Sequence, residues 1–152
     1  MKDYRGNTKE GLTVYGDNVT LYHPEKTVCI AQEGTDQDWR NTKFIPVIPE
    51  TVVKYTGVKD KNDKMIFEGD IATSEIIITG SKNGYRGNYK ATLRSEIFYN
   101  KENCRYEMRA MNVECGPEIR WALFDLEKEH TCYIPKSIEV IGNKFDNPEL
   151  IK

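Results

Sequence analysis

Residues 88–99 read NYKATLRSEIFY, and from Lys90 to Ile97 small or apolar residues alternate with polar or charged ones. The small or apolar set is Ala91, Leu93, Ser95 and Ile97, and the polar set is Lys90, Thr92, Arg94 and Glu96. Because successive side chains of a β-strand point to opposite faces, this period of two predicts a strand with one core face and one solvent face.

A second alternating strand follows in residues 104–113, with Arg105, Glu107 and Arg109 on its polar side. The intervening residues 100–103 read NKEN, which is typical of a turn. The two runs therefore predict a long antiparallel hairpin.

Short runs rich in β-branched and aromatic residues recur along the rest of the chain, separated by turn-forming residues. They lie at 12–15, 18–22, 27–31, 71–79, 119–126 and 134–142. The first three predict a meander with a tight turn at Gly16-Asp17. Residues 44–49 contain two prolines, which remove ladder donors, so they predict an edge strand or a connector.

Helix is scarce, because no segment sustains a 3.6-residue periodicity. The predicted fold class is mainly β, or α+β with little helix. Short antiparallel strands form a small barrel-like core, and the long hairpin is added to it. We predict one domain over residues 1–152, with an N-terminal β meander and connector in 1–49 and a β-rich body in 50–152.

Composition is that of an ordinary globular chain. The 152 residues are 38% hydrophobic and 30% charged, which argues against disorder and allows one core. The longest aliphatic run, Ile76–Ile78, is far short of the roughly 18 residues of a membrane span. The charged N-terminus is unlike a secretory signal, and the four cysteines are irregularly spaced. We therefore expect no membrane association and a location in the cytoplasm.

The formal net charge of -2 conceals an uneven distribution. Lys and Arg number 10 against 13 Asp and Glu in residues 1–76, 7 against 3 in residues 77–109, and 5 against 8 in residues 110–152. The three parts therefore carry -3, +4 and -3. The basic part contains the predicted hairpin, which makes it the candidate binding surface.

Basic and aromatic residues alternate with one another along the hairpin, residues 82–109. The candidate binding residues are Lys90, Arg94, Arg105, Arg109, Tyr89 and Tyr99. Cations neutralise phosphates and aromatic rings stack on bases, so this combination is compatible with nucleic-acid binding. Protein association, or simply a solvated strand face, explains the same pattern and is favoured.

Other candidate chemistry is weak. Glu68 and Asp70 are spaced to share one side of a strand and to bind a divalent cation, but beside Gly69 they more simply cap a turn. The turn at residues 59–64 is only faintly like a calcium loop, and a solvated turn is favoured. His130 and Cys132, with His23 or Cys29, lack the paired spacing of structural zinc. We therefore predict no catalytic residue, no metal and no cofactor.

Two segments resemble a known family. Residues 45–52, running into 55–62 and 67–71, and the C-terminal IEVIGN of residues 138–143, followed by DNPEL, are similar to the YopX family of bacteriophage and prophage proteins. The resemblance implies a phage-associated, β-rich, intracellular protein with no activity or site residue to carry over. One departure is Asp63, which stands where the family turn usually has glycine.

These observations predict a non-enzymatic phage or prophage accessory protein that works as a macromolecular-interaction module. Its expected partner is another protein or a second copy of itself. The alternative is nucleic-acid binding through the basic, Tyr-rich hairpin of residues 82–109.

Overall fold

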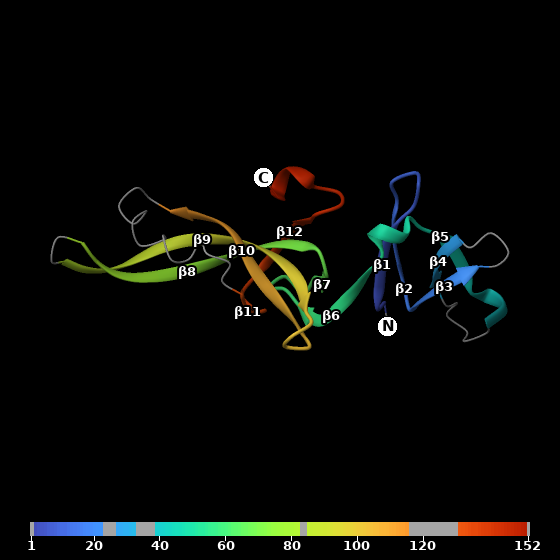
Figure 1. Ribbon diagram of the computed structural model, residues 1–152, viewed down its shortest axis with the longest axis horizontal. Helices are drawn as coiled ribbons and strands as arrows, with labels where there is room; N and C mark the ends of the chain where they lie inside the picture. Colours follow the sequence, from blue (N-terminus) through green and yellow to red (C-terminus); the bar gives the residue numbers. More distant parts are fainter. Residues whose placement is uncertain (1, 23–26, 33–38, 83–84, 116–130, 152) are drawn as a thin grey trace. The chain divides into compact units, whose positions relative to one another are not determined.

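The computed structural model describes residues 2–22, 27–32, 39–82, 85–115 and 131–151 (Figure 1). The chain divides into two compact units, residues 1–56 and 57–152, which are described separately. In the described residues every element is a β-strand or a short 3-10 helix. The predicted strand at residues 119–126 lies outside the described residues. The single domain predicted over 1–152 stays a prediction.

Two groups of antiparallel strands form the first unit. Its strands are β1 (Tyr4–Asn7), β2 (Thr13–Gly16), β3 (Asn18–Tyr22), β4 (Thr27–Gln32), β5 (Lys43–Pro46) and the start of β6 (Val53–Lys59). β1 pairs with β2 and β6, and β4 pairs with β3 and β5. The short helices η1 (Trp39–Asn41) and η2 (Pro49–Thr51) lie on either side of β5 in the sequence. Val14, Ile30 and Val47 form the buried core of this unit.

The meander predicted for residues 12–31 is wrong in one respect, because β2 and β3 lie in different sheets. Gly16-Asp17 therefore joins two sheets and is not a hairpin turn. A Cβ atom at Gly16 would overlap the carbonyl oxygen of Ala31, so glycine is needed there for close packing against β4. In contrast, the edge strand predicted from the prolines is confirmed, since β5 is an outer strand of its sheet.

The second unit is built on one five-stranded sheet in the order β11-β10-β9-β8-β12 (Figure 1). Its strands are β8 (Asp70–Lys82), β9 (Tyr85–Asn100), β10 (Arg105–Cys115), β11 (Thr131–Tyr133) and β12 (Glu139–Asn143). β7 (Met65–Phe67) lies beside β6, and the 3-10 helix η4 (Pro148–Ile151) follows β12. The last strand is shorter than predicted, because a turn occupies residues 136–137.

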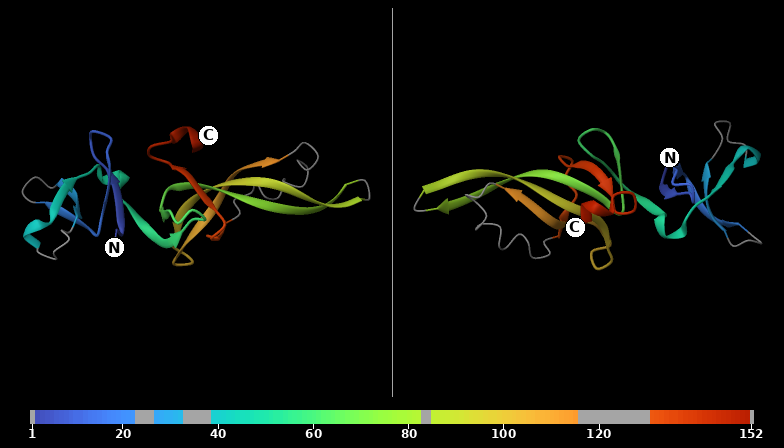
Figure 2. Two further views of the ribbon diagram at one scale, coloured as in Figure 1. Left: turned by 180° about the vertical axis from the view of Figure 1, so that it is seen from behind. Right: turned by 90° about the horizontal axis from the view of Figure 1, so that it is seen from above.

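The core of this unit lies where β8, β9, β10 and β12 come together. Its buried residues include Ile66, Ala72, Ile97, Met108 and Ile138. Beyond this core β8 and β9 continue as a long hairpin, past the end of β12 (Figure 2). The mainly β architecture with a curled, half-barrel sheet is thus confirmed, as are the paired strands of the hairpin.

Candidate interaction surface

The strand register brings the four candidate cations to one face of the sheet. Directly paired residues share a face, and Arg105 pairs with Asn100 while Arg109 pairs with Glu96. Lys90 and Arg94 lie an even number of residues from Glu96 on the same strand, so they share that face. The shared face is the one that alternation predicts to be polar.

The two candidate tyrosines lie on the other face. Tyr89 and Tyr99 are an odd number of residues from Lys90 and Arg94 along β9, so the pleat directs them oppositely. Tyr99 makes an edge-to-face contact with Tyr106 on the neighbouring strand, with ring centroids 5.1 Å apart. The basic and aromatic residues that alternate in the sequence therefore do not form one mixed surface.

Each of the three arginines contacts a partner within the chain. The Arg94 Nη2 atom is 2.8 Å from an oxygen of Glu114. The Arg105 Nε atom is 2.8 Å from an oxygen of Glu107. The Arg109 guanidinium lies over the ring of Phe98, 4.4 Å from its centroid. The two ion pairs offset part of the positive charge that would otherwise be offered to phosphates, and the contact with Phe98 holds the Arg109 guanidinium against the sheet without neutralising it.

Glu107 lies on the same face as Arg105 and Arg109, as alternation predicts, but its side chain is buried and not solvated. One carboxylate oxygen accepts a hydrogen bond from Asn100 Nδ2 at 2.8 Å. The other accepts from Asn103 Nδ2 and from Arg105 Nε, both at 2.8 Å. A buried carboxylate needs such donors, so Glu107 clamps the turn between β9 and β10.

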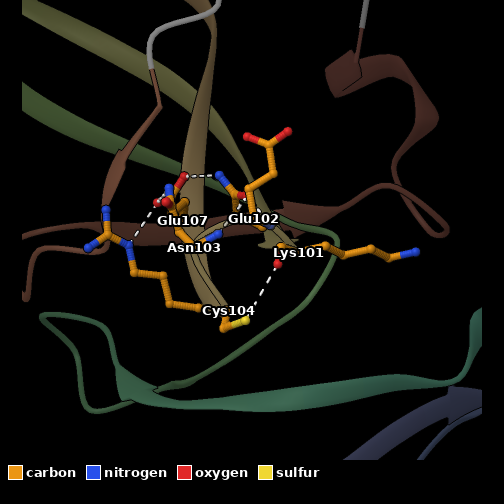
Figure 3. Close-up of polar contacts among 7 residues, drawn as sticks. Lys101, Glu102, Asn103, Cys104 and Glu107 are labelled. Atoms are coloured by element: carbon orange, nitrogen blue, oxygen red, sulfur yellow. Dashed lines mark hydrogen bonds and ion pairs between the residues drawn. The ribbon is translucent and has the colours of Figure 1, made fainter.

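The same turn is capped by its first asparagine. Asn100 Oδ1 accepts hydrogen bonds from the backbone N–H groups of Glu102 and Asn103, at 3.0 and 3.3 Å. Cys104 ends the turn with φ of 51°, and its Sγ atom is 3.5 Å from the carbonyl oxygen of Lys101 (Figure 3). Asn100 and Asn103, at the two ends of a short turn, are the sequence signal for this clamp, because asparagine side chains often form hydrogen bonds with the backbone of nearby turn residues.

The hairpin arm, defined as residues 74–82 of β8 and 85–93 of β9, presents a mixed exposed face around Ile77. Ile77 is 68% exposed and pairs with Lys90 across β8 and β9. Glu75 is also exposed and lies two residues before Ile77 on the same face. An exposed aliphatic side chain between charged neighbours resembles a small protein interface, which has an apolar centre and a polar rim.

A groove of about 540 Å³ lies near Glu139, the first residue of β12, where the pairing of β12 with β8 ends and the arm begins. Its lining includes Lys61, Ser74, Glu75, Thr92 and Glu139. Lys61 Nζ and Glu139 Oε2 form an ion pair at 2.6 Å. The hydrogen bond and the charge of Glu139 raise the pKa of Lys61, and the charge of Glu75 adds to this effect. The groove is thus polar, and the Lys61 amine in its lining is already paired with Glu139.

Asp70 has the structural role that its place beside Gly69 predicts. Its Oδ2 atom accepts a hydrogen bond from the backbone N–H of Phe67 at 2.8 Å, and the residue is fully buried. Gly69 has φ of +77°, a conformation that glycine adopts without strain. The turn-cap interpretation of this pair is therefore confirmed for Asp70.

The turn at residues 59–64 is partly different from its prediction. Asp60 is buried, whereas the solvated-turn prediction placed it at the surface. Asp63 has φ of 64°, so the aspartate at the family's glycine position does adopt the left-handed conformation. The carboxylate of Asp63 accepts a hydrogen bond from Lys59 Nζ at 2.9 Å.

Among the described residues, no group of three or more His, Cys, Asp or Glu side chains could hold a metal ion. His23 and His130 lie outside the described residues, and so does the zinc arrangement that included them. None of the described helices has the length and apolar character needed to cross a membrane.

The fold and its polar clamps define a mainly β protein whose buried carboxylates hold turns together. The chain belongs to the YopX family: the family model described as YopX protein matches residues 3–152, which confirms the resemblance seen in the sequence. A comparison with solved structures finds the crystal structure of protein EF1440 from Enterococcus faecalis. Its sequence is 19% identical to this chain, the match covers 100% of this chain and 99% of that one, and the TM-score is 0.41. A search of curated proteins finds no match.

Proposed function

We propose that this YopX-family chain is a non-enzymatic accessory module that binds another protein through its hairpin arm. The observation that carries the proposal is Ile77, which is 68% exposed at the middle of the arm. Glu75 and Lys90 flank it on the same face and supply a charged rim. In this proposal the module serves a phage or prophage and acts in the bacterial cytoplasm.

The buried carboxylates support a role without catalysis. Asp60, Asp70 and Glu107 are the charged groups that a reaction would use first, and each accepts hydrogen bonds that hold a turn. General acid-base work needs a carboxyl group within reach of a substrate. Both carboxylate oxygens of Asp60 and of Glu107 accept hydrogen bonds within the fold, and so does one oxygen of Asp70.

Affinity capture tests protein binding when the bait is altered at one position. The arm variant is Ile77→Lys, and the matched control is Leu12→Lys, because Leu12 is 66% exposed in the other unit. We expect a protein retained by the wild-type chain and by the control to be lost from the arm variant. Equal retention by both variants would contradict the proposal.

Nucleic-acid binding is the second candidate, and the shared face of Lys90, Arg94, Arg105 and Arg109 favours it. The arginine partners and the opposed tyrosines argue against it. Fluorescence anisotropy with labelled single- and double-stranded DNA at low salt tests whether the chain binds nucleic acid. Binding that weakens with salt and is lost in Arg94→Ala/Arg105→Ala would establish the alternative, and we expect neither.

A further inference from the structure

One edge of β8 is open over much of its length. On one side β9 pairs with β8 continuously from Ile71 to Lys82. On the other side β12 pairs only with residues 70–73. Within the described part of the chain, no strand pairs with that outer edge from Ser74 onward. The groove beside Ser74 and Glu75 leaves the start of this edge accessible.

The contacts of β12 show which peptide groups point outward from the open edge. The Val140 N–H donates to Asp60, and the Ile138 carbonyl accepts from Lys61, so both residues direct their peptide groups away from β8. Glu139, between them, therefore directs its peptide group toward its partner Thr73. Because the two residues of a hydrogen-bonded antiparallel pair direct their peptide groups at each other, those of Thr73 point toward β12, which is the outer side of β8.

The same alternation continues along β8, because its register with β9 has no shift. The peptide groups of Glu75, Ile77 and Thr79 therefore point outward, and those of Ile76 point toward β9. This edge has few of the features that usually prevent strand addition. It contains no proline, no bulge against β9, and one charged residue between Ser74 and Ser81.

We propose that β8 pairs antiparallel with β8 of a second copy of this chain, about a two-fold axis at Ile77. The proposal rests on the protein-binding function above and names the partner: the protein that Ile77 contacts is a second copy of the same chain. Ile77 then lies opposite Ile77 of the other copy, Ile76 opposite Ile78, and Glu75 opposite Thr79. Outward peptide groups of residues 75, 77 and 79 form about six hydrogen bonds between the copies.

Self-complementarity is the reason for choosing a second copy. The exposed aliphatic side chain of Ile77 is covered by its own counterpart, and no like charges lie directly opposite each other in residues 74–80. Centring the pair on Ile76 would place the Glu75 carboxylate opposite Ile77. Pairing ends at Ser74 on both copies, because β12 occupies the edge over residues 70–73.

Sedimentation equilibrium over a concentration series tests the pairing. We expect a mass approaching twice 17.6 kDa for the wild-type chain and for Leu12→Lys. Ile77→Lys places two ammonium groups opposite each other, and we expect it to weaken association about tenfold or more. Ile77→Pro removes an outward N–H and leaves the β8–β9 ladder intact, so it is expected to dissociate the pair as well.

Disulfide trapping tests the register without depending on a destabilising change. In a hydrogen-bonded antiparallel pair the opposed Cα atoms are about 5.5 Å apart, within the reach of a disulfide. With the exposed Cys104 replaced, Ile77→Cys/Cys104→Ser is expected to form a covalent dimer under mild oxidation, and Leu12→Cys/Cys104→Ser is not.

A wild-type chain that stays monomeric, or a dimer that survives both Ile77→Lys and Ile77→Pro, would overturn the self-pairing. Capture of another protein that still depends on Ile77 would in that case leave the proposed function standing. If instead the chain is dimeric and capture does not depend on Ile77, self-pairing stands and the binding of other proteins through the arm fails.

Discussion

The carboxylate of Asp60 accepts a hydrogen bond from the backbone N–H of Val140, 3.0 Å away and 80 residues later in the chain. Its other oxygen accepts from the N–H groups of Asn62 and Lys64, at 2.8 and 2.9 Å. One buried side chain thus closes the turn after β6 and attaches it to β12. Because β12 covers the beginning of the β8 edge, Asp60 also helps to define where the open edge starts.

Asp60→Asn is expected to destabilise the chain by about 2–3 kcal/mol, because the amide turns an NH2 group toward one of three backbone donors. The free energy of unfolding in urea measures this. Asp63→Asn in the same turn is the control, since Asp63 is exposed and Asn tolerates its φ of 64°. We expect a change within about 0.5 kcal/mol for the control. Equal effects at both positions would contradict the clamp.

The stabilisation by Asp60 is expected to depend on pH. Burial raises the pKa of Asp60, but the N–H groups of Val140, Lys64 and Asn62 outweigh it, so the pKa lies below its ordinary value of 3.8. A depressed pKa gives stability that is fully present above the unfolded-state value and is lost as the pH falls through the folded-state value. Urea unfolding from pH 7 to pH 3 is expected to show the difference between wild type and Asp60→Asn shrinking below about pH 4. A difference that stays constant over this range would refute the assignment.

Gly16→Ala is expected to cost about 3 kcal/mol or more, because the new methyl group would overlap the backbone of Ala31, which cannot move without shifting β4. Gly11→Ala in the same unit separates packing from backbone strain. Gly11 has φ of +80° and open space around it, so we expect only the left-handed conformational cost of about 1–2 kcal/mol. Thermal unfolding of the two variants compares them, and a larger loss in Gly11→Ala would be the contrary result.

Local patterns predicted the strands well because alternation and turn residues act over a few neighbours. The hairpin of β9 and β10, the edge strand β5 and the cap by Asp70 all follow from such short-range rules. Gly16 shows the limit of these rules, because a glycine used for close packing and a glycine used for a turn look alike in a sequence. β2 pairs with β1, which precedes it, and not with β3, which follows it, and the residues around Gly16 do not distinguish these two partners.

The candidate surface was predictable only in part for the same reason. Strand pairing does place the four cations on one face. Which of them form ion pairs depends on acidic partners that strand pairing brings near, such as Glu114 for Arg94. The open edge of β8 could not be predicted from the sequence either, because it depends on how far the pairing of β12 extends along β8. Charge counts therefore predict a candidate region and do not assign its role.

Glu107 provides the clearest case of a polar residue whose role depends on its contacts, and its substitution has a definite expected outcome. Glu107→Gln keeps the size of the side chain but leaves one oxygen for the donors Asn100, Asn103 and Arg105. One of these donors then faces an NH2 group at a buried side chain, so we expect a loss of about 2–3 kcal/mol in the free energy of unfolding.

Arg105→Ala removes an exposed partner of the same carboxylate, and it is expected to cost about 1 kcal/mol or less while the two asparagines remain. If the clamp is one network, the double variant Glu107→Gln/Arg105→Ala loses less than the two single losses added together, because the second change removes a bond already weakened by the first. Urea unfolding of the four chains measures this coupling. Strict additivity would mean that Arg105 and Glu107 act independently, and the turn would then be held by its asparagines alone.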